Sequence, residues 1–116
     1  MQIDERAVEN VTILDLKGKL IFGDGDALLK DKIHSLVHQG HQQILLNFGD
    51  LSYMDGPSIG EIVAGYTTVS RAGGSLKLLN LTKRTPDLLA ITKLLTVFET
   101  FPGEQEAVRS FSSPTV

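Results

Sequence analysis

Apolar and polar residues alternate near the start of the chain in the manner of β-strands. The segment Val11 to Leu16, VTILDL, has roughly the period of two that a half-buried strand requires. Gln2 to Ala7 shows a weaker form of this pattern, and Glu9-Asn10 between the two segments is suited to a turn, which predicts a β-hairpin. The following stretch, Lys17 to Gly25, is rich in glycine, and we expect it to be irregular.

From Asp26 the pattern changes to that of an amphipathic helix. Its apolar residues fall on one helical face: Leu28, Leu29, Ile33, Leu36 and Val37. Asp24 or Asp26 is suited to cap the start of this helix, and Gly40 is suited to end it. The next segment, QQILLNF, is short and almost continuously apolar, which predicts a strand buried on both faces.

The second half of the chain continues this alternation of helix and strand. A second helical stripe is followed by glycines 73 and 74, and its apolar positions are Ile59, Ile62, Val63, Tyr66 and Val69. Beyond it we expect a strand from Ser75 to Leu81 and a helix from Thr85 to about Leu95, with Thr85 as its cap and Pro86 at its first position. A last strand from Val97 to Phe101 and a short helix from Glu104 to Phe111 would follow.

The resulting order, β-β-α-β-α-β-α-β-α, is typical of an α/β domain. Such an order predicts a mixed sheet of about five strands, with four helices and right-handed crossovers. We expect residues 1–116 to form a single domain in which only the last few residues, SSPTV, are a flexible tail.

Composition and charge exclude several classes of function. The net charge of -3 gives no electrostatic reason to expect binding to nucleic acid or to an anionic membrane. The absence of cysteine excludes disulfides, thiolate metal sites and cysteine nucleophiles, and it suits a reducing cytosol. The start of the chain, MQIDERAVEN, carries two carboxylates among its first five residues and lacks the pattern of a signal peptide. We therefore expect a cytoplasmic protein.

The stretch YMDGPSIGEIV, Tyr53 to Val63, carries the most informative local chemistry. It sets an acidic residue, a Gly-Pro pair and a serine at the start of a helix, directly after a buried strand. A helix N-terminus presents unpaired N–H groups and partial positive charge, so it accommodates an anion or a phosphorylated side chain. Asp55 or Gly56 is suited to cap this helix with Pro57 at its first position, and Ser58 with Glu61 would alternatively form a capping box.

This element order, together with LNFGDLSYMDGPSIGEIV and GGSLKLLNLTKRTPDLLAITKLLTVFETF, resembles the STAS domain over nearly the whole chain. More narrowly, the chain is similar to the bacterial anti-sigma factor antagonists, also called anti-anti-sigma factors. The resemblance implies a regulator of transcription without enzymatic activity or cofactor. Its partner would be an anti-sigma factor that is also a serine kinase of the GHKL type, and binding would release a sigma factor.

The family's motif at this turn is Asp-Ser-Ser/Thr-Gly-Leu/Ile-Gly, and its first serine is the one that the partner phosphorylates. The motif's acid matches Asp55, and its last two residues match Ile59-Gly60. The phospho-acceptor position, however, is Gly56, and the next two positions are Pro57 and Ser58. Since glycine cannot carry a phosphate, we expect the usual switch to be absent, with Ser58 as an alternative, displaced acceptor.

The resemblance implies a contact surface for the partner around this turn and along the exposed face of the following helix. Its residues would be Ser52, Tyr53, Asp55, Gly56, Pro57, Ser58, Gly60, Glu61, Ala64 and Thr67, with Thr68 as an alternative to Thr67. The small residues on this helix, Gly60, Ala64, Gly65 and Thr68, would permit the approach of another chain or packing against a neighbouring helix. For Asp55, both helix capping and direct contact with a partner stay open.

Other readings of the sequence have less support. GKLIFGDGDALLK lacks the Gly-Lys-Ser/Thr ending of a P-loop and the spacing of an EF-hand. His34 and His38 are one helical turn apart, but no carboxylate completes a zinc site, and we expect no metal. Two other functions remain as alternatives: a scaffold or self-associating module, including a homodimer, and a nucleotide or small-molecule sensor.

Overall fold

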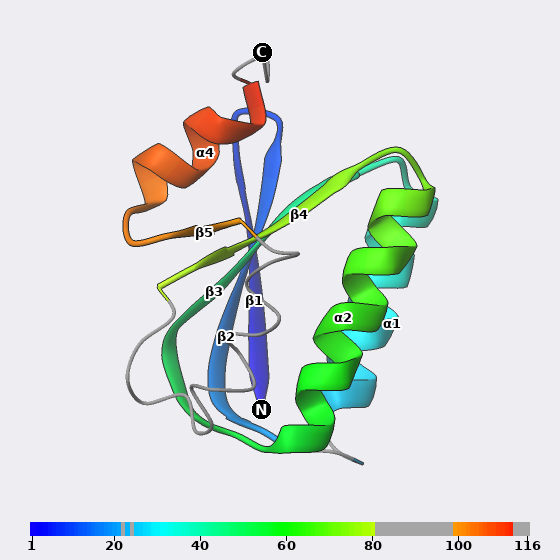
Figure 1. Cartoon of the computed structure of the whole chain (residues 1–116), viewed down its shortest axis with the longest axis vertical. Helices are drawn as coiled ribbons and strands as arrows, with labels where there is room; N and C mark the ends of the chain where they lie inside the picture. Colours follow the sequence, from blue (N-terminus) through cyan, green and yellow to red (C-terminus); the bar gives the residue numbers. More distant parts are fainter. Residues whose placement is uncertain (22, 24, 81–98, 113–116) are drawn as a thin grey trace.

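The computed structural model describes residues 1–21, 23, 25–80 and 99–112. Its centre is a five-stranded sheet in which the strands follow their order along the chain (Figure 1). The strands are β1 (Gln2–Val8), β2 (Val11–Leu20), β3 (Gln43–Met54), β4 (Ser75–Leu79) and β5 (Thr100–Phe101). Only β1 is antiparallel to its neighbour, and β2 to β5 are parallel, so the sheet is mixed as predicted.

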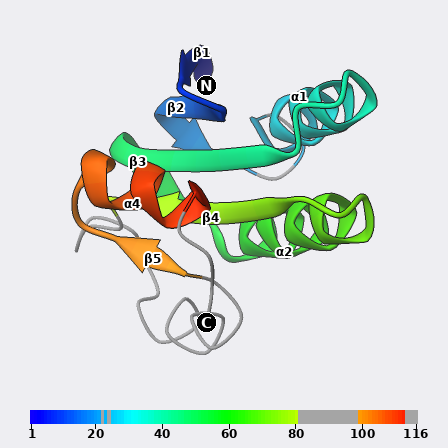
Figure 2. The same ribbon diagram turned by 90° about the horizontal axis from the view of Figure 1, so that it is seen from above.

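Helices cover both faces of this sheet. The described helices are α1 (Gly25–His38), α2 (Gly56–Arg71) and α4 (Glu104–Ser112). Helices α1 and α2 lie side by side on one face, and α4 lies on the other (Figure 2). The α/β architecture predicted from the alternation of strands and helices is confirmed, with three helices among the described residues.

The core is divided by the sheet into two apolar clusters. The larger cluster fills the space between the sheet and the α1–α2 pair, and it includes the fully buried side chains of Leu14, Leu46 and Phe48. The smaller cluster packs Ala107 and Val108 of α4 against the opposite face of the sheet. Strands β2, β3 and β4 are therefore buried on both faces along part of their length, as the nearly continuous apolar run of β3 requires.

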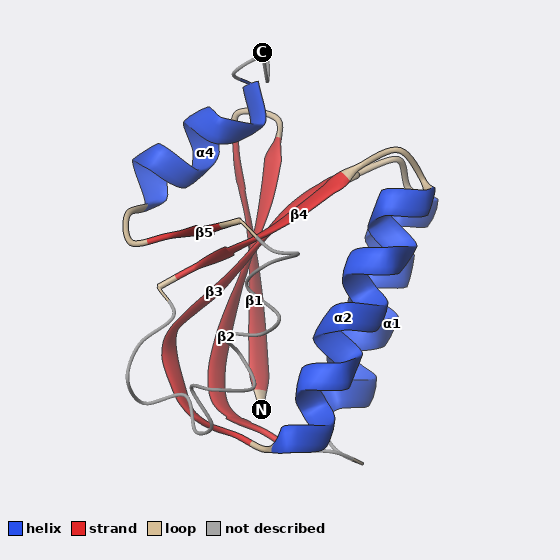
Figure 3. Cartoon of the chain, in the orientation of Figure 1, coloured by secondary structure: helices blue, strands red, loops and turns tan. Residues whose placement is uncertain are grey.

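The predicted hairpin and the predicted helix ends are confirmed. Strands β1 and β2 pair over seven residues, from Gln2–Lys17 to Val8–Val11, around a turn in which Glu9 has a positive φ of 56°. Gly40 and Gly73 have φ of +89° and +87°, and they follow the last residues of α1 and α2 in the sequence. Figure 3 shows that a loop follows each of these helices. Both glycines occupy the left-handed position that terminates many helices.

Two strands are longer than predicted. Lys17 to Leu20 continue β2, although this glycine-rich stretch was expected to be irregular. Gly18, with φ of +93°, lies between two register shifts, so it allows the strand to bend without ending. Strand β3 runs on to Met54, so Ser52 and Tyr53 belong to a strand and not to a turn.

Strand β4 ends at Leu79, two residues earlier than expected. Asn80 follows it with a positive φ of 59°, which interrupts the extended backbone. The predicted helix from Thr85 to Leu95, with Thr85 as cap and Pro86 at its first position, lies outside the described residues. The predicted capping role of Asp24 or Asp26 also falls outside the described residues and side chains. The predicted terminal helix is confirmed as α4, and β5 forms the C-terminal part of the predicted last strand.

Candidate functional site

The predicted contact surface begins where β3 passes into α2. Asp55 is the N-cap of α2, with extended backbone (φ -86°, ψ 165°), and its Oδ1 accepts a hydrogen bond from the backbone N–H of Ser58 at 3.0 Å. The backbone N–H of Asp55 donates to the carbonyl oxygen of Leu20 at 3.1 Å. The start of the helix is therefore fixed both by its own cap and by the end of β2, which agrees with the capping role predicted for Asp55.

Gly56 and Pro57 form the exposed first turn of α2. Pro57 is the second residue of the helix, where its missing N–H costs nothing because the first turn has no intrahelical acceptor. A Cβ at Gly56 would meet no atom within 4 Å, and Gly56 does not have a positive φ. The backbone at this position is therefore open to a side chain, and neither space nor strain requires a glycine.

Ser58 does not take the place that the capping-box prediction assigned to it. It is the third helical residue, its side chain is completely buried, and its Oγ has no hydrogen-bond partner. Asp55 caps the helix instead, so the predicted capping box of Ser58 and Glu61 is wrong. Because Ser58 lies on the same helical face as Ile62 and Val69, it faces the core and not a partner.

Seven of the ten predicted contact residues are exposed on one continuous segment of the chain: Ser52, Tyr53, Gly56, Pro57, Gly60, Ala64 and Thr67. Asp55 and Glu61 are partly buried at its margin. A Cβ at Gly60 would also meet no atom within 4 Å, so this face of α2 is unobstructed by the described chain. Gly65 differs, because its Cβ would lie 2.8 Å from Cδ1 of Ile33, and its small size serves the packing of α2 against α1.

The end of β2 also borders this surface, which the sequence did not indicate. The hydroxyl of Ser52 donates to the carbonyl oxygen of Gly18 at 2.9 Å. In the parallel register Lys19 pairs with Tyr53 and Leu20 pairs with Met54. This proximity depends on the extension of β2 through a glycine-rich stretch, and the periodicity of that stretch contains no signal for it.

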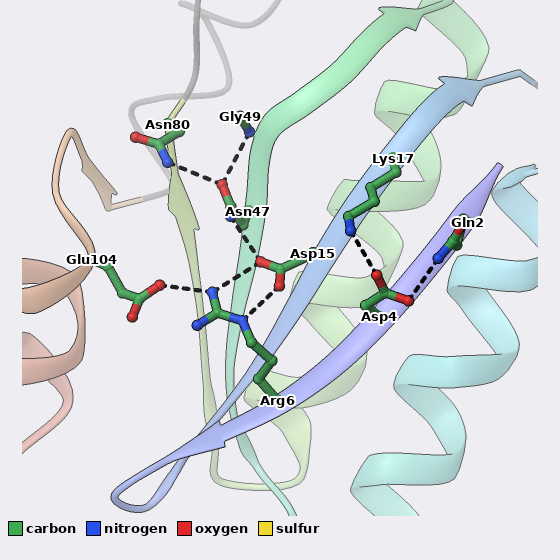
Figure 4. Close-up of polar contacts among 9 residues, drawn as sticks. All are labelled: Gln2, Asp4, Arg6, Asp15, Lys17, Asn47, Gly49, Asn80 and Glu104. Atoms are coloured by element: carbon green, nitrogen blue, oxygen red, sulfur yellow. Dashed lines mark hydrogen bonds and ion pairs between the residues drawn. The ribbon is translucent and has the colours of Figure 1, made fainter.

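A network of polar side chains lies on the face of the sheet that α1 and α2 do not cover (Figure 4). Arg6 of β1 donates to both carboxylate oxygens of Asp15, at 2.6 and 3.0 Å, and to Glu104 of α4 at 2.7 Å. Asn47 of β3 donates to Asp15 at 2.8 Å and accepts from Asn80, the residue after β4, at 3.1 Å. These bonds join three strands and the residue after β4 to the first turn of α4, so their role is structural.

Hydrogen bonds on this face of the sheet also shift the pKa values of two carboxylates, Asp15 and Asp4. Partial burial alone would raise the pKa of Asp15, but the hydrogen bonds from Arg6 and Asn47 outweigh it and hold this pKa below its ordinary value. A hydrogen bond from Lys17, with one from Gln2, lowers the pKa of Asp4, and the reciprocal contact raises the pKa of Lys17. The lowered pKa keeps the carboxylates of Asp15 and Asp4 charged near neutral pH.

Two negative findings apply to the described part of the chain. None of its helices combines the length and the apolar character that crossing a membrane demands. Within the same residues, no three histidine or acidic side chains gather closely enough to hold a metal ion.

Comparison with known proteins defines the class of this fold and site. The model of the STAS domain family matches residues 2–107. The chain is also 30% identical over 99 residues to the anti-sigma-B factor antagonist of Bacillus subtilis, a match that covers 85% of this chain and 89% of that protein. The chain therefore belongs to the STAS domain family and, within it, to the anti-sigma factor antagonists.

Solved structures share the fold. A Thermotoga maritima protein described as an anti-sigma factor antagonist superposes with a TM-score of 0.85 at 22% identity, over 96% of this chain and 95% of its own. The Bacillus anti-sigma factor antagonist SpoIIAA in its unphosphorylated form gives a TM-score of 0.76 at 20% identity, over 97% of this chain and all of its own. SpoIIAA has also been solved in a phosphorylated form.

Proposed function

We propose that this chain binds an anti-sigma factor of the GHKL serine-kinase type and thereby releases a sigma factor. This function is supported by the similarity of the chain to the anti-sigma factor antagonists. The exposed residues between Ser52 and Thr67 would form the contact surface. Gly60 and Ala64 add almost no side chain to this face, so a partner can approach the backbone of α2 closely. The protein acts by binding and catalyses no reaction.

Gly56 carries the second part of the proposal, which is that binding does not depend on phosphorylation. Gly56 stands on the exposed first turn of α2, at the position where the family's motif has its phosphorylated serine. The alternative acceptor, Ser58, is completely buried, and a kinase would reach it only after the first turn of α2 had opened. The chain therefore stays in its binding state when the partner and ATP are both present.

The contact surface is tested with one disruptive variant and one matched control. Gly60→Glu inserts a large charged side chain into the exposed face of α2, whereas Gly103→Glu makes the same change before α4, on the other side of the sheet. A Cβ meets no atom within 4 Å at either glycine, so both variants should fold. Calorimetric titration against the anti-sigma factor should show binding by the wild type and by Gly103→Glu, and loss of binding by Gly60→Glu.

The absence of the switch is tested by intact mass. After incubation with the partner kinase and ATP, the wild-type mass should be unchanged. Gly56→Ser should gain one phosphate, because its backbone is unstrained and its side chain is unobstructed. A stoichiometric phosphate on the wild type, lost in Ser58→Ala, would show that the acceptor has moved. Failure of the kinase to modify Gly56→Ser would show that this chain does not meet such a kinase.

A further inference from the structure

A bulge near the end of β3 gives Tyr53 an unusual position. The register between β2 and β3 shifts by one residue between the pairs Gly18–Leu51 and Lys19–Tyr53, so Ser52 is the extra residue. The hydroxyl of Ser52 fixes the bulge through its hydrogen bond to Gly18. Without the extra residue, Ser52 would stand opposite Lys19. The bulge therefore makes Tyr53, and not Ser52, the strand partner of Lys19, and bulges commonly redirect a side chain next to a functional site.

Tyr53 remains exposed in this position. Its relative exposure is 44%, and among the described residues only Leu28 is a comparably exposed large apolar side chain. The neighbouring residue on each side of the bulge, Leu51 and Met54, is buried in the core on the α1–α2 face. Nothing in the core thus requires an aromatic ring at Tyr53, whereas tyrosine is among the residues that most often anchor protein–protein interfaces.

The charges on this face of the sheet single out Lys19. Along β2 the outward residues are Asp15, Lys17 and Lys19, and Figure 4 shows the first two held in polar contacts. Asp15 is paired with Arg6, and Lys17 is paired with Asp4 at 2.8 Å. Lys19 is exposed and forms no ion pair within the described residues. Lys19, which pairs with Tyr53 in the strand register, is thus a cation that the described part of the sheet leaves without an ion pair.

We propose that Tyr53 and Lys19 together form an anchor for the partner, and that the partner offers an apolar pocket with a carboxylate at its rim. This inference rests on the proposed function and extends its contact surface from α2 onto the end of β2. The surface is continuous, because the backbone N–H of Asp55 donates to the carbonyl oxygen of Leu20. The ring enters the pocket, and the ammonium group pairs with the carboxylate.

The two members of the anchor affect binding kinetics in different ways. Tyr53→Ala removes the buried contact and should speed dissociation of the complex at least about tenfold, whereas Tyr53→Phe should dissociate like the wild type. Lys19→Glu should slow association several-fold at low salt, and the difference should shrink as the ionic strength rises, because steering by an exposed charge is screened. Surface plasmon resonance at two salt concentrations measures both rates.

Arg71→Glu is the matched control for the charge reversal, since Arg71 is exposed in the last turn of α2, at the opposite end of that helix. It should associate like the wild type. If Tyr53→Ala and Lys19→Glu both bind like the wild type while Gly60→Glu does not bind, the anchor is refuted and the proposed function stands. If the wild type does not bind an anti-sigma factor, the proposed function fails and the anchor fails with it.

Discussion

At the scale of single residues, Asp55 combines a capping role with a position at the margin of the contact surface. Asp55→Ala removes the hydrogen bond to the N–H of Ser58 and should lower the free energy of unfolding by about 1 kcal/mol. Asp55→Asn keeps an equally good cap, so its stability should stay near that of the wild type. Urea denaturation measures both effects.

Asp55→Asn also separates capping from contact with a partner. If the carboxylate only caps the helix, Asp55→Asn should bind the anti-sigma factor as tightly as the wild type. A weaker complex with unchanged stability would contradict that expectation and would assign the charge of Asp55 to the interface.

Ser58 provides a second residue-scale prediction. Its buried hydroxyl has no hydrogen-bond partner, so Ser58→Ala removes an uncompensated polar group and also improves helix propensity. The free energy of unfolding should rise by about 0.5 to 1 kcal/mol in urea denaturation, and binding of the partner should not change. A loss of stability would mean that the hydroxyl is satisfied in solution.

The sequence could place Asp55 correctly but not Ser58. Both residue types favour the first turn of a helix, and each has a suitable residue three positions later to share a hydrogen bond. Only the position at which the strand ends decides between them, and β3 ends at Met54, one residue before Asp55. Ser58 is consequently inside the helix, where its side chain turns toward the core.

At the scale of the elements, Gly74 and Gly60 differ in whether their surroundings leave space for a side chain, and alanine substitutions at both test the packing of the helices and strands. A Cβ at Gly74 would overlap the backbone carbonyl of Gln42, where the N–H of Ser75 donates at 2.8 Å to start the β3–β4 pairing. Gly74→Ala should therefore lower the free energy of unfolding by at least about 2 kcal/mol. Gly60→Ala fills open space on a helix and should raise it by up to about 1 kcal/mol. Equal melting temperatures of the two variants would contradict this assignment.

Most elements were predictable because their apolar periodicity agrees with their environment. The hairpin, α1, α2, β4 and α4 each bury apolar residues against the core, and glycines follow the ends of α1 and α2. The extensions of β2 and β3 were not predictable, since Gly18 and Ser52 break the alternation there. A bulge conserves the pairing of two strands while it shifts their register, so it is invisible to a search for a period of two.

At the scale of the whole molecule, the network around Asp15 links stability to pH. The pKa of Asp15 is lower in the folded chain than its ordinary value near 3.9, so the folded state holds this proton more weakly than the unfolded state does. Its contribution is therefore complete above about pH 5 and is lost as the pH falls through the folded pKa.

Asp15→Asn should cost about 1 kcal/mol at neutral pH, a modest value because Arg6 is partly exposed. The difference in unfolding free energy between the wild type and Asp15→Asn should shrink as the pH falls from about 5 to 2. A constant difference across this range, measured by urea denaturation, would contradict the account. The sequence could not predict this network, because it joins residues as distant as Arg6 and Glu104.

The central claim is that this STAS protein binds its partner without a phosphorylation switch, and the most direct test is the affinity of the complex before and after exposure to ATP. The chain is titrated with the anti-sigma factor in a calorimeter, once directly and once after incubation with a catalytic amount of the kinase, ATP and Mg²⁺. The same dissociation constant is expected in both titrations, whereas Gly56→Ser should bind only before the incubation. Loss of wild-type binding after incubation, or no binding at all, would contradict the claim.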